Sequence, residues 1–376
     1  MKTKRASNFE LMRIVAIAMI ILHHIVVHCF YPQLTDGSLM AKFNNGWFCN
    51  PKFYPQLLIP EALAPLGKTG VALFMLLSGY FMVGRGRDTH LARHMGKLLG
   101  QVGFAALAVM GASLAYYKCV DTYVPVLKLN IFNDIWWFVG FYACVIALGA
   151  ACLNRWLDGL SREAYLGVLV AGYAVAGLSW SGALLNSLAD GLRTLAAGIL
   201  CYAGGGFLRK FNPLGRVRAW VLVLVVLVVY ALIGLSYYSA VTTTVDGYLQ
   251  GDRSGFYMQP VGTSSYSEWS VAPIVMGVSI FELFRRVKLK PSRIVNGMAS
   301  ATFMIYLIHD NELTRNFWKH RVDLVTLLYR TPLKFCLAMA LRVLSVLAMG
   351  LAAYGVYRAL LWALGRLKPV FLKPEG

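Results

Sequence analysis

An arginine and two histidines share one face of the first apolar segment of this chain. Residues 10–31 read ELMRIVAIAMIILHHIVVHCFY, a run long enough to cross the roughly 30 Å hydrocarbon core of a bilayer as a helix. Arg13 and His24 are eleven positions apart, close to three helical turns, so both side chains leave the helix on one face about 16 Å apart. His28 follows one turn later on that face, whereas His23 points about 100° away from it. Because ionisable groups are costly at membrane depth, we expect this face to line a protein interior or a water-filled cavity.

The residue types on this face suit proton transfer and anion binding. Histidine can take up a proton near neutral pH, since its unperturbed pKa is about 6.5. The guanidinium of Arg13 presents a fork of donors that matches phosphate oxygens. The structural alternatives are that His24 is only a hydrogen-bonded helix residue and that Arg13 only anchors the helix at the membrane surface.

The composition is that of a polytopic membrane protein. Of the 376 residues, 58% are hydrophobic and only 14% are charged, which is too apolar for an ordinary soluble fold of this length. The net charge of +19 could suggest nucleic acid as a partner. The basic residues, however, form short clusters between apolar segments, so they indicate the positive-inside rule and contacts with anionic lipid headgroups instead.

Ten apolar segments are candidates for membrane-spanning helices. They are 10–31, 66–83, 98–117, 135–153, 164–180, 188–208, 219–239, 269–284, 294–311 and 333–364. Lys and Arg are enriched in alternate connections, most strongly in 285–293, and we therefore place both termini in the cytoplasm. The expected architecture is an all-α bundle of about ten transmembrane helices in a single domain covering 1–376. Residues 32–65, 240–267 and 312–332 are expected to be outer loops.

Three further motifs follow the Arg13 and His24 pair along the chain. Residues 70–81 read GVALFMLLSGYF and precede a basic stretch with Arg85, Arg87 and Arg93; the dipeptide Trp136-Trp137 and Phe138 open the fourth apolar segment; and residues 306–311 read YLIHDN at the outer end of the ninth. In order and spacing, these motifs resemble the membrane-bound acyltransferase 3 family of integral membrane O-acyltransferases, which modify bacterial surface polysaccharides and related glycans. The resemblance covers nearly the whole chain. The chain departs from the family pattern at two places. Leu73 stands where the family usually has a phenylalanine. The family often has an RxxR element near the third apolar segment, whereas here Arg93 is followed by His94 and then by Lys97.

The resemblance implies an enzyme of the bacterial plasma (inner) membrane. It would transfer an acyl group, which we expect to be acetyl, from cytoplasmic acyl-CoA to a sugar hydroxyl of an exopolysaccharide, an O-antigen-like chain or another lipid-linked surface glycan. Acetyl-CoA or another acyl-CoA is then the donor substrate, and the partners are the glycan acceptor and membrane lipids. We expect no metal, because no third ligand accompanies the pair of His24 and His28.

The resemblance also suggests roles for individual residues. His24 would be catalytic, either as the base that removes the hydroxyl proton or as a carrier that accepts the acyl group covalently, and Arg13 would assist at the donor. The donor phosphates would be bound by Arg85, Arg87 and Arg93, and substrate would be contacted by His28, Ser78, Trp137, Tyr306 and His309. For several of these the sequence leaves a structural role open: the three loop arginines as topology anchors, Ser78 and Gly79 as a close-packing signal, and Trp137 as an interface anchor.

Two other classes of membrane protein remain possible. A transporter or flippase for a lipid-linked sugar would use the buried Arg and His to line a conduit, but the paired broken helices of two related halves are not visible in the sequence. A glycan polymerase would usually carry a large outer loop with catalytic charges. Residues 240–267 hold only Asp246, Asp252 and Arg253.

Overall fold

The computed structural model describes residues 6–35, 53–84, 91–120, 136–176, 190–250, 270–315 and 322–371. These residues are almost entirely helical and include no strand, so the all-α prediction is confirmed. The first half contains α1 (Ser7–Ile25), the π-helix η1 (Val26–Phe30), α2 (Tyr31–Thr35), α4 (Phe53–Gln56), α5 (Leu58–Leu63), α6 (Leu66–Met82), α7 (Leu91–Val120), α8 (Trp137–Leu148), the π-helix η3 (Gly149–Leu153), α9 (Asn154–Gly159) and α10 (Arg162–Ala176). The second half contains α11 (Asp190–Phe211), α12 (Ala219–Leu249), α14 (Val271–Arg286), α15 (Arg293–Ser300), α16 (Thr302–His309), α18 (Leu324–Arg330) and α19 (Pro332–Phe371).

Six helical segments of the described residues are long and apolar enough to cross a membrane. They are Ser7–Gln33, Leu58–Met82, Leu91–Cys119, Trp137–Gly159, Ala219–Ser239 and Pro332–Arg366. The four other apolar segments of the sequence contain α10, α11, α14 and the pair α15 and α16, which is interrupted at Ala301. The total of ten spans and the cytoplasmic position of both termini therefore stay predictions.

The three expected outer loops contain more helix than predicted. Within 32–65 the chain forms part of α2 together with α4 and α5, and α5 runs into α6 because Ala64 and Pro65 keep helical backbone angles. Helix α12 continues ten residues beyond 239 to Leu249. Within 312–332 lies α18, whose first turn is capped by the Asp323 carboxylate, which accepts a hydrogen bond from the Thr326 backbone N–H.

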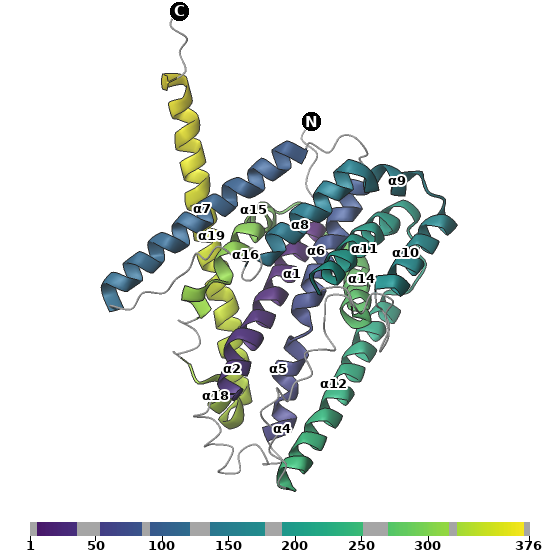
Figure 1. Cartoon of the computed structure of the whole chain (residues 1–376), viewed down its shortest axis with the longest axis vertical. Helices are drawn as coiled ribbons and strands as arrows, with labels where there is room; N and C mark the ends of the chain where they lie inside the picture. Colours follow the sequence, from purple (N-terminus) through teal and green to yellow (C-terminus); the bar gives the residue numbers. More distant parts are fainter. Residues whose placement is uncertain are drawn as a thin grey trace, which may run out of the picture.

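Helix α6 occupies the centre of the bundle and packs against α1, α11 and α14 (Figure 1). Its contact with α11 is close enough to require glycine on both sides. A Cβ at Gly79 would lie 1.7 Å from the Tyr202 carbonyl oxygen, and one at Gly205 would lie 2.0 Å from the Leu76 carbonyl oxygen. Small residues of this kind let two membrane helices approach backbone to backbone. Gly79 of the Ser-Gly motif is therefore a packing residue.

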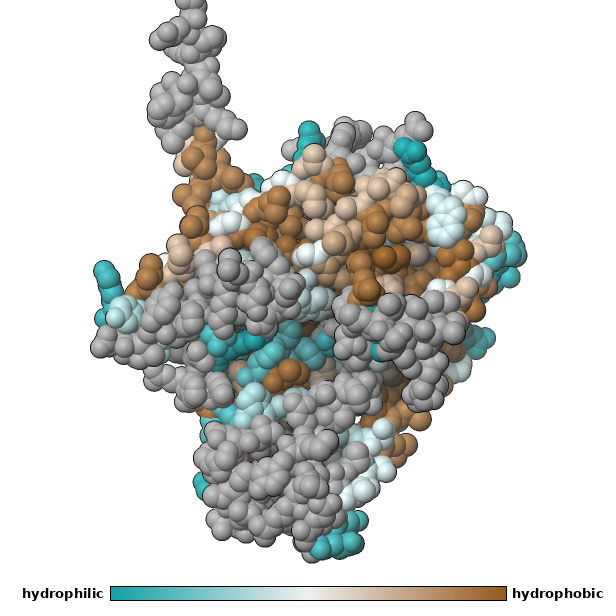
Figure 2. Space-filling view, viewed as in Figure 1, coloured by the Kyte–Doolittle hydropathy of each residue, from teal (hydrophilic) through white to brown (hydrophobic). Residues whose placement is uncertain are grey.

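The outer surface carries the apolar side chains expected of a protein in lipid. On α12, the side chains of Leu227, Leu232 and Leu235 are each about 60% exposed or more, and few residues of that helix are buried. Figure 2 shows apolar residues covering much of the face over α8 and α12. The polar and charged side chains that could take part in a reaction lie inside the bundle, between α1, α6, α7, α8 and α16.

Candidate active site

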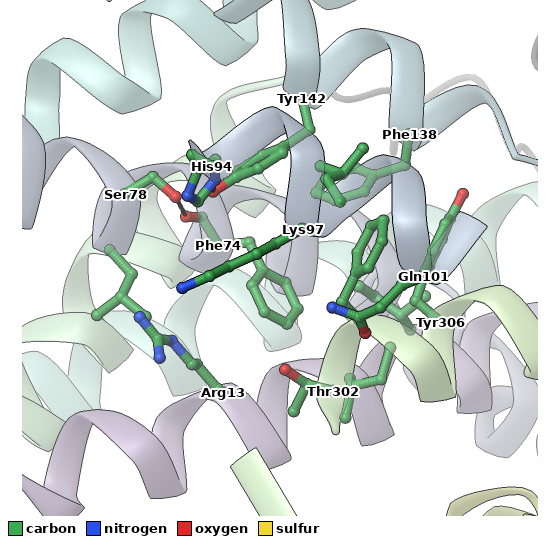
Figure 3. Close-up of a pocket in the computed structure, with 15 residues that line it drawn as sticks. Arg13, Phe74, Ser78, His94, Lys97, Gln101, Phe138, Tyr142, Thr302 and Tyr306 are labelled. Carbon is green, nitrogen blue, oxygen red and sulfur yellow. Dashed lines mark hydrogen bonds between the residues drawn. The ribbon is translucent and has the colours of Figure 1, made fainter. Parts of the chain in front are cut away.

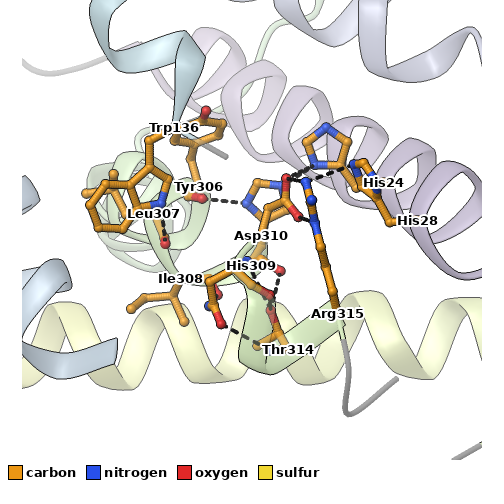
Figure 4. Close-up of polar contacts among 11 residues, drawn as sticks. His24, His28, Trp136, Tyr306, Leu307, Ile308, His309, Asp310, Thr314 and Arg315 are labelled. Atoms are coloured by element: carbon orange, nitrogen blue, oxygen red, sulfur yellow. Dashed lines mark hydrogen bonds and ion pairs between the residues drawn. The ribbon is translucent and has the colours of Figure 1, made fainter. Parts of the chain in front are cut away.

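His24 of α1 meets two polar residues from the end of α16. Its Nδ1 lies 2.7 Å from Nε2 of His309 and 3.3 Å from an oxygen of the Asp310 carboxylate (Figure 4). The rings of His24 and His309 are stacked, with centroids 4.9 Å apart. His309 and Asp310 are both buried. The C-terminal ends of α1 and α16, which are far apart in the chain, therefore form one polar cluster.

The hydrogen bonds define which nitrogen of His24 can act as a base. The Tyr306 carbonyl oxygen accepts a hydrogen bond from His309 Nδ1, because a carbonyl oxygen can only accept. In neutral His309 the other nitrogen, Nε2, then carries a lone pair and accepts from His24 Nδ1. His24 is left with its lone pair on Nε2. That nitrogen can take a proton from a substrate hydroxyl, while Asp310 lies within reach of the imidazolium that would form.

Arg315 holds the Asp310 carboxylate in place. Its guanidinium donates to both carboxylate oxygens, over 2.6 Å and 2.9 Å, and its Nη2 also lies 3.0 Å from Nε2 of His28. Because arginine can only donate, His28 accepts here through Nε2. His28 therefore contacts the residue that fixes Asp310.

The cluster raises the question of a metal ion, since Asp310 supplies the third potential ligand that the sequence did not indicate. One ligand atom each from His24, His28 and Asp310 lies within 4.8 Å of the others. However, Arg315 binds both Asp310 oxygens and faces His28 Nε2. A cation would have to displace this guanidinium, so the donor set fits the ion pair better than a metal.

The turn after α16 is rigidly held. The Asn311 side chain donates to the Ile308 carbonyl and accepts from the Thr314 backbone N–H, and the Thr314 hydroxyl bonds to carbonyl oxygens of this turn. The fully buried Trp136 donates its indole N–H to the Leu307 carbonyl, 3.1 Å away. These contacts fix the direction in which His309 and Asp310 leave the helix.

A cavity of about 280 Å³ extends from the neighbourhood of this cluster toward Arg13, near the N-terminus of α1 (Figure 3). Arg13 and Lys97 give it one cationic end, and Lys97 extends across it with its ammonium group toward Arg13. His94 also lines the cavity. The Arg13 guanidinium also pairs with Glu10, at 3.0 Å. Aromatic and aliphatic side chains form most of the remaining wall. We call this space the large cavity.

A second and much smaller cavity, of about 20 Å³, is lined by His24 itself. It shares Ile20, Phe138 and Tyr306 with the large cavity, and its other walls include His23, Lys68 and Trp137. Its volume is about that of one water-sized group. We call it the small cavity; the three shared side chains separate it from the large one.

Five of the ten predicted site residues, His24 among them, line one of these two cavities. Arg13 and Ser78 line the large cavity, Trp137 lines the small one, and Tyr306 lines both. His309 lines neither and lies behind His24. The Ser78 hydroxyl donates to the Phe74 carbonyl one turn earlier, which is a helix-internal bond.

Among the described residues that line the large cavity, none is one of the three arginines predicted to bind the donor phosphates. Arg93 lies on the exposed side of the first turn of α7, and Arg85 and Arg87 fall outside the described residues. Helix α7 begins at Leu91, so the second half of the expected basic loop is helical. This places Lys97, one turn after Arg93, at the cavity instead.

Sequence reasoning missed several residues that the structure places at the site. Asp310 stood in the YLIHDN motif without an assigned role, and the basic charge of Lys97 was noted only as a departure from the family pattern. No sequence signal connected Arg315 or Lys68 to His24. Glu10, three residues before Arg13, could have been recognised as its partner from helical spacing.

The arrangement suits transfer of a group from a phosphate-bearing donor to a hydroxyl. The cationic end of the large cavity can bind phosphate. His24, the candidate proton acceptor, lines the small cavity, which shares three side chains with the large one.

Comparison with known proteins gives the class of enzyme. A family model described as an acyltransferase domain matches residues 7–354. No curated protein and no solved structure matched the chain. The matched range includes α1, α16 and every residue that lines the two cavities. Because the match extends over nearly the whole sequence, this chain belongs to the acyltransferase 3 family of membrane proteins.

Proposed function

We propose that this protein is an O-acyltransferase of the bacterial plasma membrane that moves an acetyl group from cytoplasmic acetyl-CoA to a sugar hydroxyl of a surface or lipid-linked glycan. The observation that carries the proposal is His24, a candidate base that lies beside the buried Asp310 carboxylate and lines the small cavity. The family match supports the class of reaction, and the donor and acceptor are those that the resemblance to this family implies.

In this reaction the acceptor hydroxyl loses its proton to His24 Nε2 as its oxygen attacks the thioester carbonyl. The new C–O bond forms, the C–S bond breaks, and the proton on His24 passes to the departing thiolate. The negative charge of Asp310 stabilises the imidazolium between these two steps. The other possibility, in which Nε2 first takes the acetyl group and then passes it to the hydroxyl, uses the same geometry.

The large cavity is the proposed donor site. Coenzyme A carries several phosphates, and Arg13 and Lys97 supply cationic donors at one end of the cavity. The apolar walls, including Phe74 and Phe303, suit the uncharged arm that carries the thioester. Arg85, Arg87 and Arg93 lie in sequence between Ser78 and His94, which line this cavity, and would contact the parts of the donor that remain in the cytoplasm.

The decisive experiment follows labelled acetyl from acetyl-CoA to extracted glycan, using membranes that contain the wild-type protein or a variant. His24→Asn keeps a side-chain amide that can bond to His309 but removes the basic nitrogen. We expect it to lower the transfer rate by at least about 10², the lower end for loss of a general base. Accumulation of label on the wild-type protein without acceptor would identify His24 as an acyl carrier.

The matched control is His23→Asn. His23 is adjacent in sequence and lines the same small cavity, but its Nδ1 donates to the Ala64 carbonyl and its ring packs against Gly67. Asparagine can keep that hydrogen bond, so transfer should stay within an order of magnitude of the wild-type rate. Equal losses in both variants would mean that the imidazoles act through packing, and the catalytic assignment would fail.

A further inference from the structure

The wall of the large cavity carries a carboxamide that has no hydrogen-bond partner among the described residues. It belongs to Gln101 of α7, and Figure 3 shows it among the side chains that line the cavity. Its Oε1 is buried and receives no hydrogen bond. A buried acceptor that stays unpaired costs about 1–3 kcal/mol. A bound molecule with an N–H group at this place would supply the missing donor.

Other polar groups of the same wall already have partners among the described residues. The hydroxyls of Ser78 and Thr302 donate to backbone carbonyl oxygens, over 2.8 Å and 2.9 Å. The Tyr142 hydroxyl lies 3.4 Å from Nε2 of His94. Gln101 therefore differs from its neighbours in the cavity wall, because both groups of its carboxamide are available to a ligand.

Gln101 lies between the cationic end of the large cavity and the polar cluster of the candidate active site. It follows Lys97 by one turn on α7, so the two side chains leave the helix on one face, about 6 Å apart along its axis. The Lys97 ammonium extends toward Arg13. Further along α7, Val109 packs against Ile308, at the end of α16 where the polar cluster lies. A donor with its phosphates at Lys97 and its thioester near the polar cluster would pass Gln101.

We propose that Gln101 binds a secondary amide in the arm of the acyl donor, between the phosphates and the thioester. A glutamine side chain can donate and accept at once, which matches the C=O and N–H groups of an amide. Its terminal torsion is broad, so either group can turn toward the bound arm. This inference rests on the proposed acyltransferase function and adds how the arm of the donor is recognised.

The spacing on α7 selects one of the two amides in the arm of coenzyme A. A short carbon chain separates the diphosphate from the nearer amide, and a single helical turn separates Lys97 from Gln101. We therefore assign the amide nearer to the phosphates to Gln101. In the alternative role, Gln101 only holds water in the cavity, and it would then place no demand on the chemistry of the arm.

The experiment compares acetyl-CoA with two analogues in which an oxygen atom replaces the N–H of one amide or of the other. Each analogue keeps the phosphates, the thioester and the length of the arm. For the analogue changed at the amide nearer to the phosphates, the wild-type enzyme should lose about tenfold in kcat/KM, equivalent to about 1.4 kcal/mol. The other analogue should be used nearly as well as acetyl-CoA. Gln101→Leu should lose about tenfold on acetyl-CoA, through a raised donor KM, and should use the three donors alike.

The matched control is Gln250→Leu, the same change at the exposed glutamine that follows α12, which should behave as the wild type. Ratios between donors are taken on one enzyme preparation, so a smaller folded fraction of Gln101→Leu does not alter them. The subsite would be overturned if the wild-type enzyme used all three donors equally, if its loss were confined to the other amide, or if Gln101→Leu kept the wild-type preference. Absence of transfer from acetyl-CoA by the wild-type enzyme would instead refute the proposed function itself.

Discussion

At the residue scale, three histidines of the first helical segment, Ser7–Gln33, differ in role because their partners differ. His23 donates to a backbone carbonyl of the segment before α6, His28 accepts from Arg315, and His24 faces His309 and Asp310. The residue type is the same in each case. The buried carboxylate beside His24 is what suits that position to a proton-transfer step.

The size of the small cavity gives a prediction about the acyl group. Its volume of about 20 Å³ favours acetyl over longer chains near His24. Val71 lines this cavity but not the large one, so Val71→Ala should widen it by two methyl groups. We expect the ratio of kcat/KM for propionyl-CoA to that for acetyl-CoA to rise about tenfold, the effect of one methylene in an apolar pocket.

The control for Val71→Ala is Leu77→Ala, which enlarges only the large cavity. That variant also removes a buried aliphatic side chain, so loss of stability alone would affect both. The ratio of the two donors should change only in Val71→Ala. A change of similar size in Leu77→Ala would move the determinant of acyl length into the large cavity.

At the element scale, adjacent residues of one short motif make different contacts. In the Trp136, Trp137 and Phe138 motif, the first residue holds α16 through the Leu307 carbonyl. The second lines the small cavity, and the third separates the two cavities. The helical start of α8 explains this division, because successive residues point about 100° apart.

The Ser-Gly motif of α6 gives a prediction about helix packing. Gly79→Ala should place a methyl group against the Tyr202 carbonyl oxygen, which belongs to the rigid backbone of α11. We expect a loss of stability at or above the upper end of the range of about 1–3 kcal/mol for overpacked cores. The measurement is the temperature of unfolding of the purified protein in detergent.

Gly234→Ala on α12 provides the comparison, because nothing lies within 4 Å of a Cβ at that position. It should be neutral or slightly stabilising, since alanine is the better helix former. If Gly79→Ala unfolded at the same temperature as Gly234→Ala, the close contact between α6 and α11 would have to be reconsidered.

At the scale of the whole molecule, the proposed reaction needs a donor and an acceptor on opposite sides of the membrane. Charge bias predicts that the end of α12 is outside and that residues 287–290 are inside. Both Gln250 and Lys290 are exposed, so single cysteines there in a cysteine-free background should be accessible to reagent. Gln250→Cys should react with an impermeant maleimide in intact cells, and Lys290→Cys only after permeabilisation.

The reverse labelling pattern would invert the topology and place the donor cavity on the outside. Reaction of both cysteines in intact cells would indicate leaky cells, which a cytoplasmic marker protein checks in the same sample. The expected pattern supports cytoplasmic acetyl-CoA as the donor, because Lys290 and the cationic end of the large cavity are predicted to be on one side.

The amino-acid sequence by itself determined the all-α membrane class, the family and the shared face of Arg13 and His24. These features depend on apolar segment length and on the 3.6-residue period of a helix, which are local properties of the chain. The same local reasoning placed helix ends less well, as the extension of α12 to Leu249 and the early start of α7 demonstrate.

Only the tertiary structure decided which groups surround His24. His309 is separated from it by 285 residues, and Asp310, Arg315 and Lys68 reach the same place from other parts of the chain. Their approach depends on how α1, α6 and α16 pack, and packing is set by the shapes of many side chains together. The spacing of residues along one helix cannot encode contacts between different helices, which is why His24 could be named as a candidate base from the sequence but its carboxylate neighbour could not.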